Sequence, residues 1–324
     1  MVVKLLNTTL DILIVKTCLK CTEKELCSGF CRSHFKKYFE EKVKKTIKKF
    51  NLFSHKDKIA VAVSGGKDST VLLYVLKKLE YNVTGLTVNA FIGNYTKKNV
   101  ENLREVCKKY DIPLKEISFK DEFGYSLCYI RSILNQGKKE QKVSSCFLCG
   151  VLRRYLINKY AREMKFDAVA TGHTLDDEAQ AFLMNIFRND VMLARRQGPI
   201  TGLGGNSAFV KRVKPLYLCT ENETTAYSKL MNFPVNYERC PCSVDAYRRN
   251  FRSFLEEFEK KHPSAKYNIV NFFLETIHKQ KDKYKSDVIG TCELCREPSA
   301  RNMCKKCEII GELRKKLSQQ NPKT

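Results

Sequence analysis

The residues of this chain that could do chemistry begin with a glycine-rich loop at positions 64–70, which reads Ser-Gly-Gly-Lys-Asp-Ser-Thr. The loop follows a short apolar run at 59–63 and precedes a helical pattern with apolar residues on one face. A strand, a two-glycine turn and a helix N-terminus present backbone N–H groups to an anion. Glycine permits the tight turn and lets a phosphate approach the backbone. With Lys67, Asp68 and two hydroxyls in place, the loop predicts a phosphate site rather than a plain strand-to-helix turn.

The spacing of this loop differs from the Walker motif, in which the lysine follows the first glycine at a longer interval. The loop instead resembles the SGGxDS signature of the PP-loop ATP pyrophosphatases, which cleave ATP between the α and β phosphates. The resemblance implies adenylation of a substrate oxygen, with pyrophosphate as the leaving group. The ATP-binding residues that it implies in the loop are Ser64, Gly65, Gly66, Lys67, Asp68 and Ser69.

Paired cysteines near the C-terminus form the strongest local motif. Cys292 and Cys295 make one CxxC pair, and Cys304 and Cys307 make a second pair after eight intervening residues. Two such pairs can place four thiolates tetrahedrally around a zinc ion. The polar residues around them argue against a dry cysteine core. We therefore predict a structural zinc site, because four protein ligands leave no open coordination position.

A second set of metal-ligand residues lies near the N-terminus. The pair Cys18 and Cys21 matches the spacing of Cys31 and His34, which suggests a zinc site of three cysteines and one histidine. Cys27 lies between the pairs and is an alternative ligand. The spacing from Cys31 favours His34 as a ligand over a surface or capping role.

A third cysteine pair, Cys146 and Cys149, stands at the head of a predicted helix at 150–164. It has no second CxxC pair nearby, but the distant Cys240 could supply a third thiolate. Three cysteines around a [4Fe–4S] cluster leave one iron open, and this iron can hold a sulfur atom. A redox disulfide or a catalytic pair that forms a persulfide would use the same residues. Spacing alone does not separate these three interpretations.

Composition narrows the class of protein. The chain has 324 residues, 15 cysteines and a formal net charge of +24. The absence of a secretory signal and the CxxC spacing indicate metal binding in a reducing, cytoplasmic compartment rather than disulfides. No apolar run is long enough to span a bilayer, so we expect no membrane partner. The basic charge predicts a polyanionic partner, most simply a nucleic acid.

The elements that must position these residues alternate along the middle of the chain. Apolar runs at 59–63, 83–88, 114–119 and 168–171 predict strands, with helical patterns between them. This alternation predicts an α/β fold with a doubly wound parallel sheet, flanked by zinc modules. A loop is expected at 198–205, a closing strand at 213–216 and helices at 34–50 and 221–231. The predicted domains are an extension (1–17), a zinc module with a helix (18–56), a PP-loop domain (57–250), a basic helical region (251–290) and a zinc module with a tail (291–324).

Four motifs in chain order make the family resemblance more specific. SGGKDST at 64–70 is followed by CFLCG at 146–150, TGHTLDDEAQ at 171–180 and RCP at 239–241. With a zinc module at each end, they resemble the tRNA 2-thiolation enzymes of the TtcA/TtuA type, which include the archaeal and eukaryotic thiouridine synthetases of the cytosol. The resemblance covers residues 18 to about 310, and the doubled zinc modules favour the thiouridine branch.

This resemblance implies a reaction and assigns residues to it. ATP would adenylate the C2 oxygen of a tRNA uridine, and sulfur would then replace that oxygen. Cys146, Cys149 and Cys240 match the ligands of a [4Fe–4S] cluster, and Asp177 matches an active-site aspartate that faces ATP and Mg²⁺. The implied catalytic residues are Asp177, Cys146 and Cys240; Gly172 and Arg153 join the ATP-binding set.

Neighbouring residues are expected to play simpler parts. Asp176 is expected to complement the helix dipole, and Arg154 to lie on the surface or contact tRNA. Basic pairs at 36–37, 138–139, 195–196 and 248–249 could follow tRNA phosphates.

Two departures from the family stand out. Asn89 replaces an acidic turn after the second strand, and Cys242 is an extra cysteine that could substitute for Cys240 or relay sulfur.

Several points stay open on the sequence alone. The modified uridine could be at position 34 or 54 of the tRNA. The sulfur donor could be a ubiquitin-like thiocarboxylate carrier, a cysteine desulfurase product or sulfide, and the family implies a homodimer. Other PP-loop synthetases, such as a tRNA lysidine synthetase or an amidotransferase-type enzyme, would not need Cys146, Cys149 or Cys240. A non-catalytic zinc-ribbon RNA binder would not need the loop carboxylate or Asp177.

Overall fold

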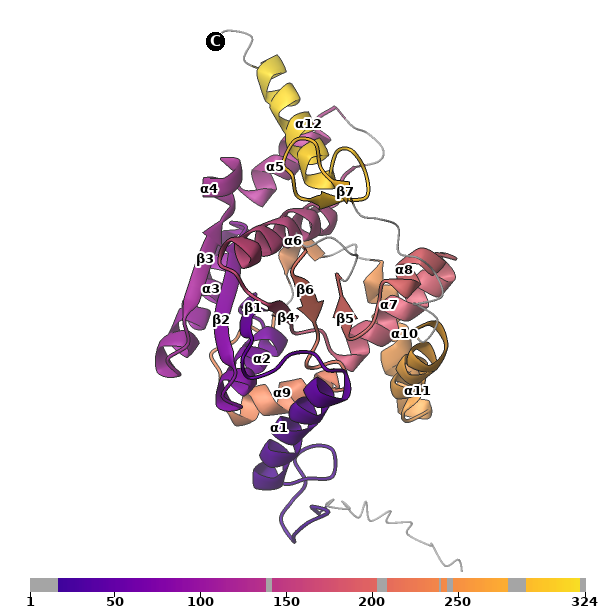
Figure 1. Ribbon diagram of the computed structural model, residues 1–324. Helices are drawn as coiled ribbons and strands as arrows, with labels where there is room; N and C mark the ends of the chain where they lie inside the picture. The colour runs from indigo at the N-terminus through magenta and orange to yellow at the C-terminus, as the bar shows by residue number, and fades with distance from the viewer. Residues whose placement is uncertain are drawn as a thin grey trace, which may run out of the picture.

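The computed structural model describes residues 17–137, 142–202, 209–238, 240–243, 247–278 and 290–320. Within these residues the centre is a six-stranded sheet in the spatial order β3-β2-β1-β4-β6-β5 (Figure 1). All neighbouring strands run parallel except β5, which pairs with β6 in the antiparallel sense. The strands are β1 (Lys58–Ala62), β2 (Asn82–Asn89), β3 (Leu114–Ser118), β4 (Ala168–Thr171), β5 (Ile200–Thr201) and β6 (Lys211–Val213).

The chain reverses its direction of travel across the sheet beside β1. It passes from β1 to β2 and β3 on one side, and then returns to place β4 on the other side of β1. Ala62 at the end of β1 consequently lies between Leu86 of β2 and Thr171 of β4. Open α/β sheets bind ligands at the carboxyl ends of the strands at such a switch point. The loops that follow β1 and β4 meet there.

Helices cover both faces of the sheet, which explains the nearly continuous apolar run at 59–63. Ile59 and Val61 join a core with α1 (Arg32–Lys49), α2 (Lys67–Lys78), α3 (Gly93–Lys109) and α9 (Glu221–Leu230). Ala60, between them, packs on the opposite face in a core with α6 (Ser145–Glu163). Residues one apart in a strand point to opposite faces, so each face of β1 serves a different helix layer.

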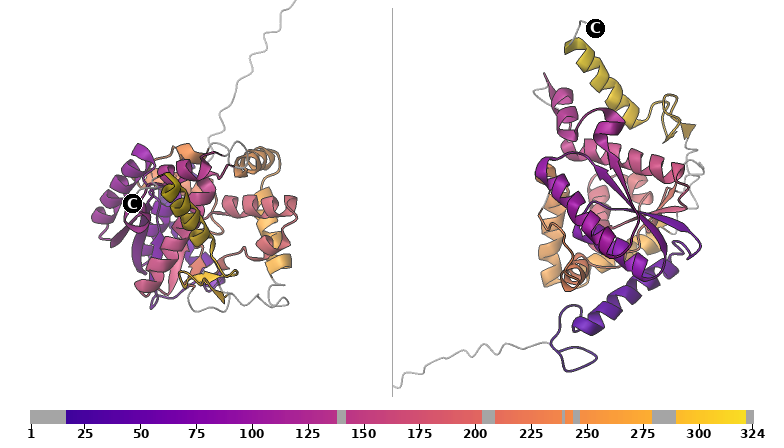
Figure 2. Two further views of the ribbon diagram at one scale, coloured as in Figure 1. Left: turned by 90° about the horizontal axis from the view of Figure 1, so that it is seen from above. Right: turned by 90° about the vertical axis from the view of Figure 1, so that its left-hand side faces the viewer.

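Small cysteine-bearing modules stand at opposite ends of the molecule (Figures 1 and 2). The N-terminal module leads into α1, and the C-terminal module contains β7 (Gly290–Thr291), β8 (Pro298–Ser299) and α12 (Lys305–Gln320), which packs on α5 and α6. The other elements are α4 (Phe119–Phe123), α5 (Leu127–Asn135), α7 (Leu175–Phe187), α8 (Val191–Arg195), η1 (Pro241–Ser243), α10 (Arg248–Lys261), α11 (Ala265–Phe273) and η2 (Leu274–His278).

The predicted α/β fold with a mostly parallel, doubly wound sheet is confirmed, with small differences at one edge. β5 lies in the stretch 198–205, for which the sequence predicts a loop, since a two-residue strand carries no readable periodicity. β6 ends at Val213 rather than continuing to 216, because Pro215 cannot donate a ladder hydrogen bond. The predicted domain boundary at 250/251 falls inside α10.

Some predictions concern residues outside the described parts of the chain. They are most of the N-terminal extension (1–16), the basic pair at 138–139, Arg239, the end of the basic helical region (279–289) and the last four residues. Among the described helices, none has the length and apolar character that crossing a membrane requires.

Candidate active site and metal-binding modules

The PP-loop joins the end of β1 to the start of α2, with Gly66 as the N-cap of this helix. The Ser69 hydroxyl accepts a hydrogen bond from the Ser64 N–H (3.2 Å) and donates one to the Gly66 carbonyl (3.1 Å), which holds the loop closed. Because Gly66 has no side chain with which to cap the helix, the first N–H groups of α2 stay available. A helix start of this kind favours bound phosphate.

Two glycines allow this loop to pack as closely as it does. Gly65 has a φ of +78°, and a Cβ there would lie 2.5 Å from the carbonyl oxygen of Asn99 in α3. Gly172, in the loop after β4, approaches the backbone at the start of α2, where its Cβ would lie 2.9 Å from the Ser69 nitrogen. A larger residue at position 65 would push the PP-loop away from α3, and one at position 172 would push the loop after β4 away from the start of α2.

Lys67 is held by two carboxylates. Its ammonium group lies 2.9 Å from both Asp68 and Glu221, and Arg252 of α10 contacts Glu221 at 2.6 Å. Burial alone would lower the pKa of Lys67, but the charges of Asp68 and Glu221 raise it above its usual value. Burial raises the pKa of Asp68 against the effect of Lys67. The lysine ammonium group and two carboxylates therefore lie beside the loop. A phosphate attracts a cation of this kind, and its magnesium ion binds carboxylates.

Asp177 uses its two carboxylate oxygens differently. Oδ2 accepts a hydrogen bond from the Thr174 N–H (3.0 Å) in a capping box at the start of α7, whereas Oδ1 lies 3.5 Å from the guanidinium group of Arg248. Burial opposes ionisation, but the charges of His173 and Arg248 and the bonds from Thr174 lower the pKa of Asp177. One oxygen of the ionised carboxylate therefore fixes the helix start, and the other faces Arg248 at the site.

The neighbouring Asp176 has a structural role that extends beyond the helix dipole. It is buried, accepts a hydrogen bond from the Glu221 N–H (2.7 Å) and pairs with Lys266 at 2.8 Å. These contacts tie α7 to α9 and α11. Asn89, at the position where the family resemblance led us to expect an acidic turn, accepts a hydrogen bond from the Phe91 N–H (2.9 Å) and so shapes the turn after β2.

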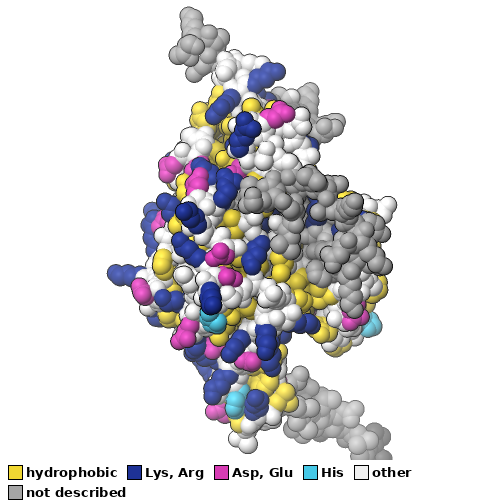
Figure 3. All heavy atoms as spheres, viewed as in Figure 1, with side chains coloured by type: hydrophobic (Ala, Val, Ile, Leu, Met, Phe, Trp, Pro, Cys, Tyr) yellow, Lys and Arg dark blue, Asp and Glu magenta, His cyan; other side chains and the backbone are white. Residues whose placement is uncertain are grey.

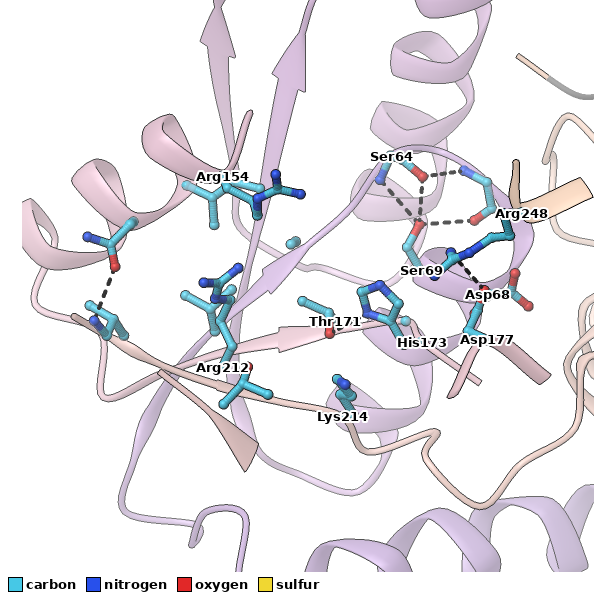
Figure 4. Close-up of a pocket in the computed structure, with 18 residues that line it drawn as sticks. Ser64, Asp68, Ser69, Arg154, Thr171, His173, Asp177, Arg212, Lys214 and Arg248 are labelled. Carbon is cyan, nitrogen blue, oxygen red and sulfur yellow. Dashed lines mark hydrogen bonds and ion pairs between the residues drawn. The ribbon is translucent and has the colours of Figure 1, made fainter. Parts of the chain in front are cut away.

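A cavity of about 550 Å³ opens between the PP-loop, the start of α7 and α6 (Figure 4). The predicted residues that line it are Ser64, Gly66, Asp68, Ser69, Gly172 and Asp177. Gly65 and Lys67 support the loop from behind, through Asn99 and Glu221. The volume falls in the usual range for sites that bind small molecules.

The cavity is lined by Arg154 and not by Arg153, in contrast to the family-based assignment. Successive residues of an α-helix point about 100° apart, so the side chains of Arg153 and Arg154 leave α6 in different directions. The buried Nε of Arg153 has no hydrogen-bond partner among the described residues. Arg153 lies close enough to Tyr95 to influence its pKa, as does Cys240.

Sequence reasoning missed several further residues of the cavity. His173 belongs to the TGHT motif, and its Nδ1 lies 2.9 Å from the Thr171 hydroxyl, while burial lowers the pKa of its imidazole. Lys214 pairs with the buried Glu178 at 2.7 Å. The histidine was visible in the motif; Lys214, Arg212 and Arg248 come from distant segments with no local signal. The side chains labelled in Figure 4 show this set around the cavity.

The third cysteine pair lies in the first turn of α6, capped by Ser144. Cys240 and Cys242 lie at η1, which packs against this turn, and the Cys146 Sγ is 3.5 Å from the Cys242 carbonyl oxygen. Burial raises the pKa of Cys240, and the charges of Cys242, Cys149 and Cys146 act in the same direction. The three predicted cysteines therefore come together, with Cys242 beside them.

The donor set at this site fits an iron–sulfur cluster better than a zinc ion. The described part of the chain holds two groups of ligand atoms within 4.8 Å of one another, and these three cysteines are in neither. Each cysteine of a cubane cluster binds a different iron, so its sulfurs must stand further apart than those around one zinc ion. Cys149, Cys240 and Cys242 pack against an apolar cluster that includes Leu148 and Leu152.

Helix α6 links the cysteine site to the cavity. Arg154, which lines the cavity, follows Cys149 by five residues, and the Cys149 thiol opposes the lowering of the Arg154 pKa that burial causes. A second link passes through α3, where Asn99 contacts Gly65 of the PP-loop and Tyr95, one turn earlier, is influenced by Cys240. The cysteine site and the PP-loop therefore lie near the same two helices, α3 and α6.

The N-terminal module gathers the four predicted ligand side chains around one point. The His34 Nδ1 lies 3.5 Å from the sulfurs of Cys18 and Cys21 and 3.3 Å from that of Cys31. Cys27 is outside this group and contacts the Ser28 hydroxyl at 3.6 Å. The geometry thus selects His34 over Cys27 as the fourth member.

The C-terminal module repeats this arrangement with four thiols, those of Cys292, Cys295, Cys304 and Cys307. The sulfurs of Cys295 and Cys304 are 3.6 Å apart. In both modules the pKa of the first cysteine thiol is lowered, although burial acts to raise it. Backbone N–H groups of Cys31 and Lys20 lower the pKa of Cys18 to about 6, and those of Cys304, Cys295 and Leu294 do the same for Cys292. Ionised thiolates are the form that binds metal.

Comparisons with known proteins show which proteins this chain is similar to. Residues 35–252 match the PP-loop domain family. The tRNA-5-methyluridine(54) 2-sulfurtransferase of Pyrococcus horikoshii is 38% identical over 288 residues, which are 89% of each chain. The cytoplasmic tRNA 2-thiolation protein 1 of Drosophila melanogaster is 33% identical over 295 residues, covering 89% of this chain and 83% of the relative.

A solved structure is similar as well. The U34-tRNA thiolase NcsA from Methanococcus maripaludis, with its [4Fe–4S] cluster, superposes with a TM-score of 0.75 at 29% identity. The match covers 93% of this chain and 97% of that one. The extent of these matches, together with the PP-loop and the cysteine motifs, leads to one conclusion: this chain belongs to the PP-loop family of tRNA 2-thiolation proteins.

Proposed function

We propose that this protein is an ATP-dependent tRNA uridine 2-sulfurtransferase, which produces 2-thiouridine. The observation that carries the proposal is that α6 runs from the cysteine site to the PP-loop cavity. This helix bears Cys146 and Cys149 at its start and presents Arg154 to the PP-loop cavity about one turn later. One helix therefore connects the thiol site, which is suited to hold sulfur, with the cavity of the PP-loop, which is suited to activate an oxygen.

The adenylation step follows from the PP-loop. The C2 oxygen of uridine would attack the α-phosphorus of ATP, and the bond to the β-phosphate would break, with pyrophosphate as the leaving group. The N–H groups at the start of α2 would hold the phosphates and stabilise the departing charge. Lys67 pairs with Asp68 and Glu221 and would keep the loop in place. Asp68 and Asp177 line the cavity and would provide carboxylate ligands for Mg²⁺.

The second step replaces the activated oxygen with sulfur. Sulfur would add to C2, and the C2–O bond would break, so that AMP departs with the oxygen. A [4Fe–4S] cluster held by Cys146, Cys149 and Cys240 would supply an iron without a protein ligand, at which sulfur can be kept for transfer. The chain itself contributes the thiols, a capped helix that fixes two of them, and the apolar surroundings of Leu148 and Leu152.

The tRNA substrate is supported by the names of the relatives and by charge. The relatives include a protein named for uridine 54 and one named for U34, and we infer that the target is uridine at one of these positions. The net charge of +24 suits a polyanion, and lysines and arginines are spread over the face seen in Figure 3. We assign structural zinc ions to the two terminal modules, because each offers four protein ligands.

The proposal extends to the partners and the compartment. A ubiquitin-like thiocarboxylate carrier or sulfide would provide the sulfur, and two copies of the chain would form the working unit. Fifteen cysteines and an iron–sulfur cluster need reducing conditions, which supports a cytoplasmic location.

The test is an anaerobic reaction of the purified protein with Mg-ATP, sulfide and unmodified tRNA. We expect tRNA-dependent pyrophosphate release, together with 2-thiouridine in the digested tRNA by mass spectrometry. Analysis of the anticodon and T-arm fragments identifies the position. In a parallel reaction that contains lysine in place of sulfide, pyrophosphate release with lysine incorporation would instead indicate a lysidine synthetase. Binding of tRNA without any pyrophosphate release would indicate a non-catalytic RNA binder.

A further inference from the structure

Two arginines in the cavity stand without an acidic partner. Arg154 from α6 and Arg212 from β6 both line it, and neither makes a salt bridge or a side-chain hydrogen bond with any residue in the described ranges. The other lysine and arginine side chains of the lining are paired, Lys214 with Glu178 and Arg248 with Asp177. The unpaired positive charge is therefore confined to one part of the cavity.

The two guanidinium groups lie together at the end of the cavity away from Ser64 and Arg248 (Figure 4). Burial lowers the pKa of Arg212, and the positive charge of Arg154 lowers it further, so the two groups repel each other. Gly150 leaves room for the Arg154 side chain, because a Cβ at position 150 would lie 3.1 Å from the Arg154 Nη1. Two like charges held in a cavity are unfavourable until an anion joins them.

The chemistry of the anion follows from the donors. Guanidinium groups bind the oxygens of phosphate through paired hydrogen bonds, and two of them can grip a single phosphate. The phosphates of ATP already have a site at the opposite end, at the start of α2. A uridine whose C2 oxygen reaches that site must leave its stack and enter the cavity. Its flanking backbone phosphates are attached to its sugar and enter with it.

We propose that Arg154 and Arg212 form a second phosphate site, which holds the backbone phosphate next to the target uridine. The inference rests on the proposed function, because it requires an RNA uridine as the substrate. Contacts to backbone phosphate position a nucleotide without reading its sequence. The pair would thus fix the uridine between the PP-loop and the cysteine site and leave the choice of tRNA to other surfaces.

The test is a binding experiment without ATP. Wild type and Arg212→Ala are titrated with a synthetic RNA stem-loop that carries the target uridine, either unmodified or with an uncharged methylphosphonate on one side of that uridine. We expect one methylphosphonate to weaken binding to the wild type about tenfold. Arg212→Ala should bind the unmodified RNA about tenfold more weakly and lose less affinity with the methylphosphonate than the wild type does, because only the Arg154 contact to that phosphate then remains to be removed.

Control variants show whether the effect belongs to these two arginines. Arg104→Ala removes an exposed arginine of α3 that pairs with Glu116, and should leave RNA binding unchanged. Arg154→Ala should repeat the result of Arg212→Ala, and an unchanged melting temperature would show that both variants fold. Equal methylphosphonate losses in wild type and both variants would overturn the inference.

A second arm distinguishes the two sources of phosphate. Mg-ATP binding measured without RNA should be the same in wild type and Arg212→Ala. The RNA site would be overturned if Arg212→Ala bound Mg-ATP about tenfold more weakly than the wild type but lost as much RNA affinity with the methylphosphonate as the wild type does. The arginines would then be assigned to ATP. Failure of the proposed function would be seen separately, as absence of tRNA-dependent pyrophosphate release by the wild type.

Discussion

The guanidinium group of Arg248 lies 3.5 Å from the Asp177 carboxylate, where the first turn of α10 meets the start of α7. Both side chains line the PP-loop cavity (Figure 4). Arg248 begins a helix that continues to Lys261, most of it in a stretch that the sequence assigned to a separate basic region. The adenylation site therefore includes a side chain from α10, and this helix supports the ionised form of Asp177.

Replacement of Arg248 by alanine should change the pH dependence of the reaction. Arg248 contributes to the lowered pKa of Asp177, so its removal should raise that pKa. Asp177 would then lose its charge at a higher pH as the solution is acidified. We expect the acid limb of the pH profile of kcat/KM for ATP to move upward, and kcat/KM at neutral pH to fall about tenfold. Pyrophosphate release at a series of pH values measures both effects.

Arg249→Ala is the matched control for this prediction. It removes the same charge one position further along α10, and Arg249 is not among the residues of the cavity lining. We expect its acid limb to coincide with that of the wild type. An unmoved limb in Arg248→Ala would show that the arginine does not influence the charge of Asp177.

Gly172→Ala should weaken nucleotide binding. The added Cβ would lie 2.9 Å from the Ser69 nitrogen, which is backbone and cannot swing aside, so the loop after β4 must retreat from the start of α2. We expect Mg-ATP affinity, measured by calorimetry, to fall more than tenfold, which corresponds to over about 1.4 kcal/mol. Gly311→Ala in α12, where no atom lies within 4 Å of the new Cβ, is the control and should bind as the wild type does.

The N-terminal module should respond differently to two of its cysteines. Cys21 lies within the four-ligand group and Cys27 outside it. Cys21→Ala should lower the zinc content by one ion per chain, because three ligands hold zinc less tightly than four. Cys27→Ala should retain that ion. Metal analysis of the two variants decides the matter, and loss of zinc from Cys27→Ala alone would show that the ligand set is misassigned.

Glu223 should anchor the N-terminal module to α9. Its buried carboxylate lies 2.8 Å from the Lys42 ammonium and accepts hydrogen bonds from the hydroxyls of Tyr38 (2.9 Å) and Ser28 (3.0 Å). Glu223→Gln would leave the Lys42 charge without its partner, so we expect the free energy of unfolding at pH 7 to fall by about 3 kcal/mol. Urea unfolding measures this change. Glu116→Gln, at an exposed pair with Arg104, should cost less than about 1 kcal/mol.

The contribution of Glu223 should also depend on pH in a defined direction. Burial alone would raise its pKa, but the Lys42 charge and the accepted hydrogen bonds lower it. A carboxyl group whose folded pKa is lowered stabilises the fold above its unfolded pKa, about 4.3 for Glu. That stability is lost as the pH falls through the folded value. The difference between wild type and Glu223→Gln should therefore shrink in acid, and a constant difference would contradict the assignment.

The features that could be predicted from the sequence are those set by near neighbours. The apolar run at 59–63, the two glycines and the pattern of α2 specify a strand, a tight turn and a helix within about twenty residues. The CxxC spacings likewise fix which thiols can close on one ion. The parallel sense of the sheet follows from the alternation of strands and helices, because a helix between two strands returns the chain to the same edge.

The features that could not be predicted depend on distant segments. Arg248 reaches Asp177 from α10, and Arg212 lies near Arg154 at one end of the cavity, with no signal in the spacing of either pair. The choice between Arg153 and Arg154 depends on the rotation of α6, which a helical pattern defines only to within part of a turn. The meeting of Cys240 with Cys146 and Cys149 was suggested by the need for a third thiolate and by family resemblance, not by the spacing of the residues.

The central claim is that the three cysteines of α6 and η1 serve the sulfur step while the PP-loop serves the adenylation step. The most direct measurement follows pyrophosphate and 2-thiouridine together in anaerobic reactions of wild type, Cys240→Ala and Cys242→Ala, with iron counted in each protein. We expect both products and about four iron atoms per chain for wild type and Cys242→Ala. Cys240→Ala should lose its iron and form no 2-thiouridine, yet still release pyrophosphate with tRNA. Formation of 2-thiouridine by Cys240→Ala at the wild-type rate would contradict this division of roles.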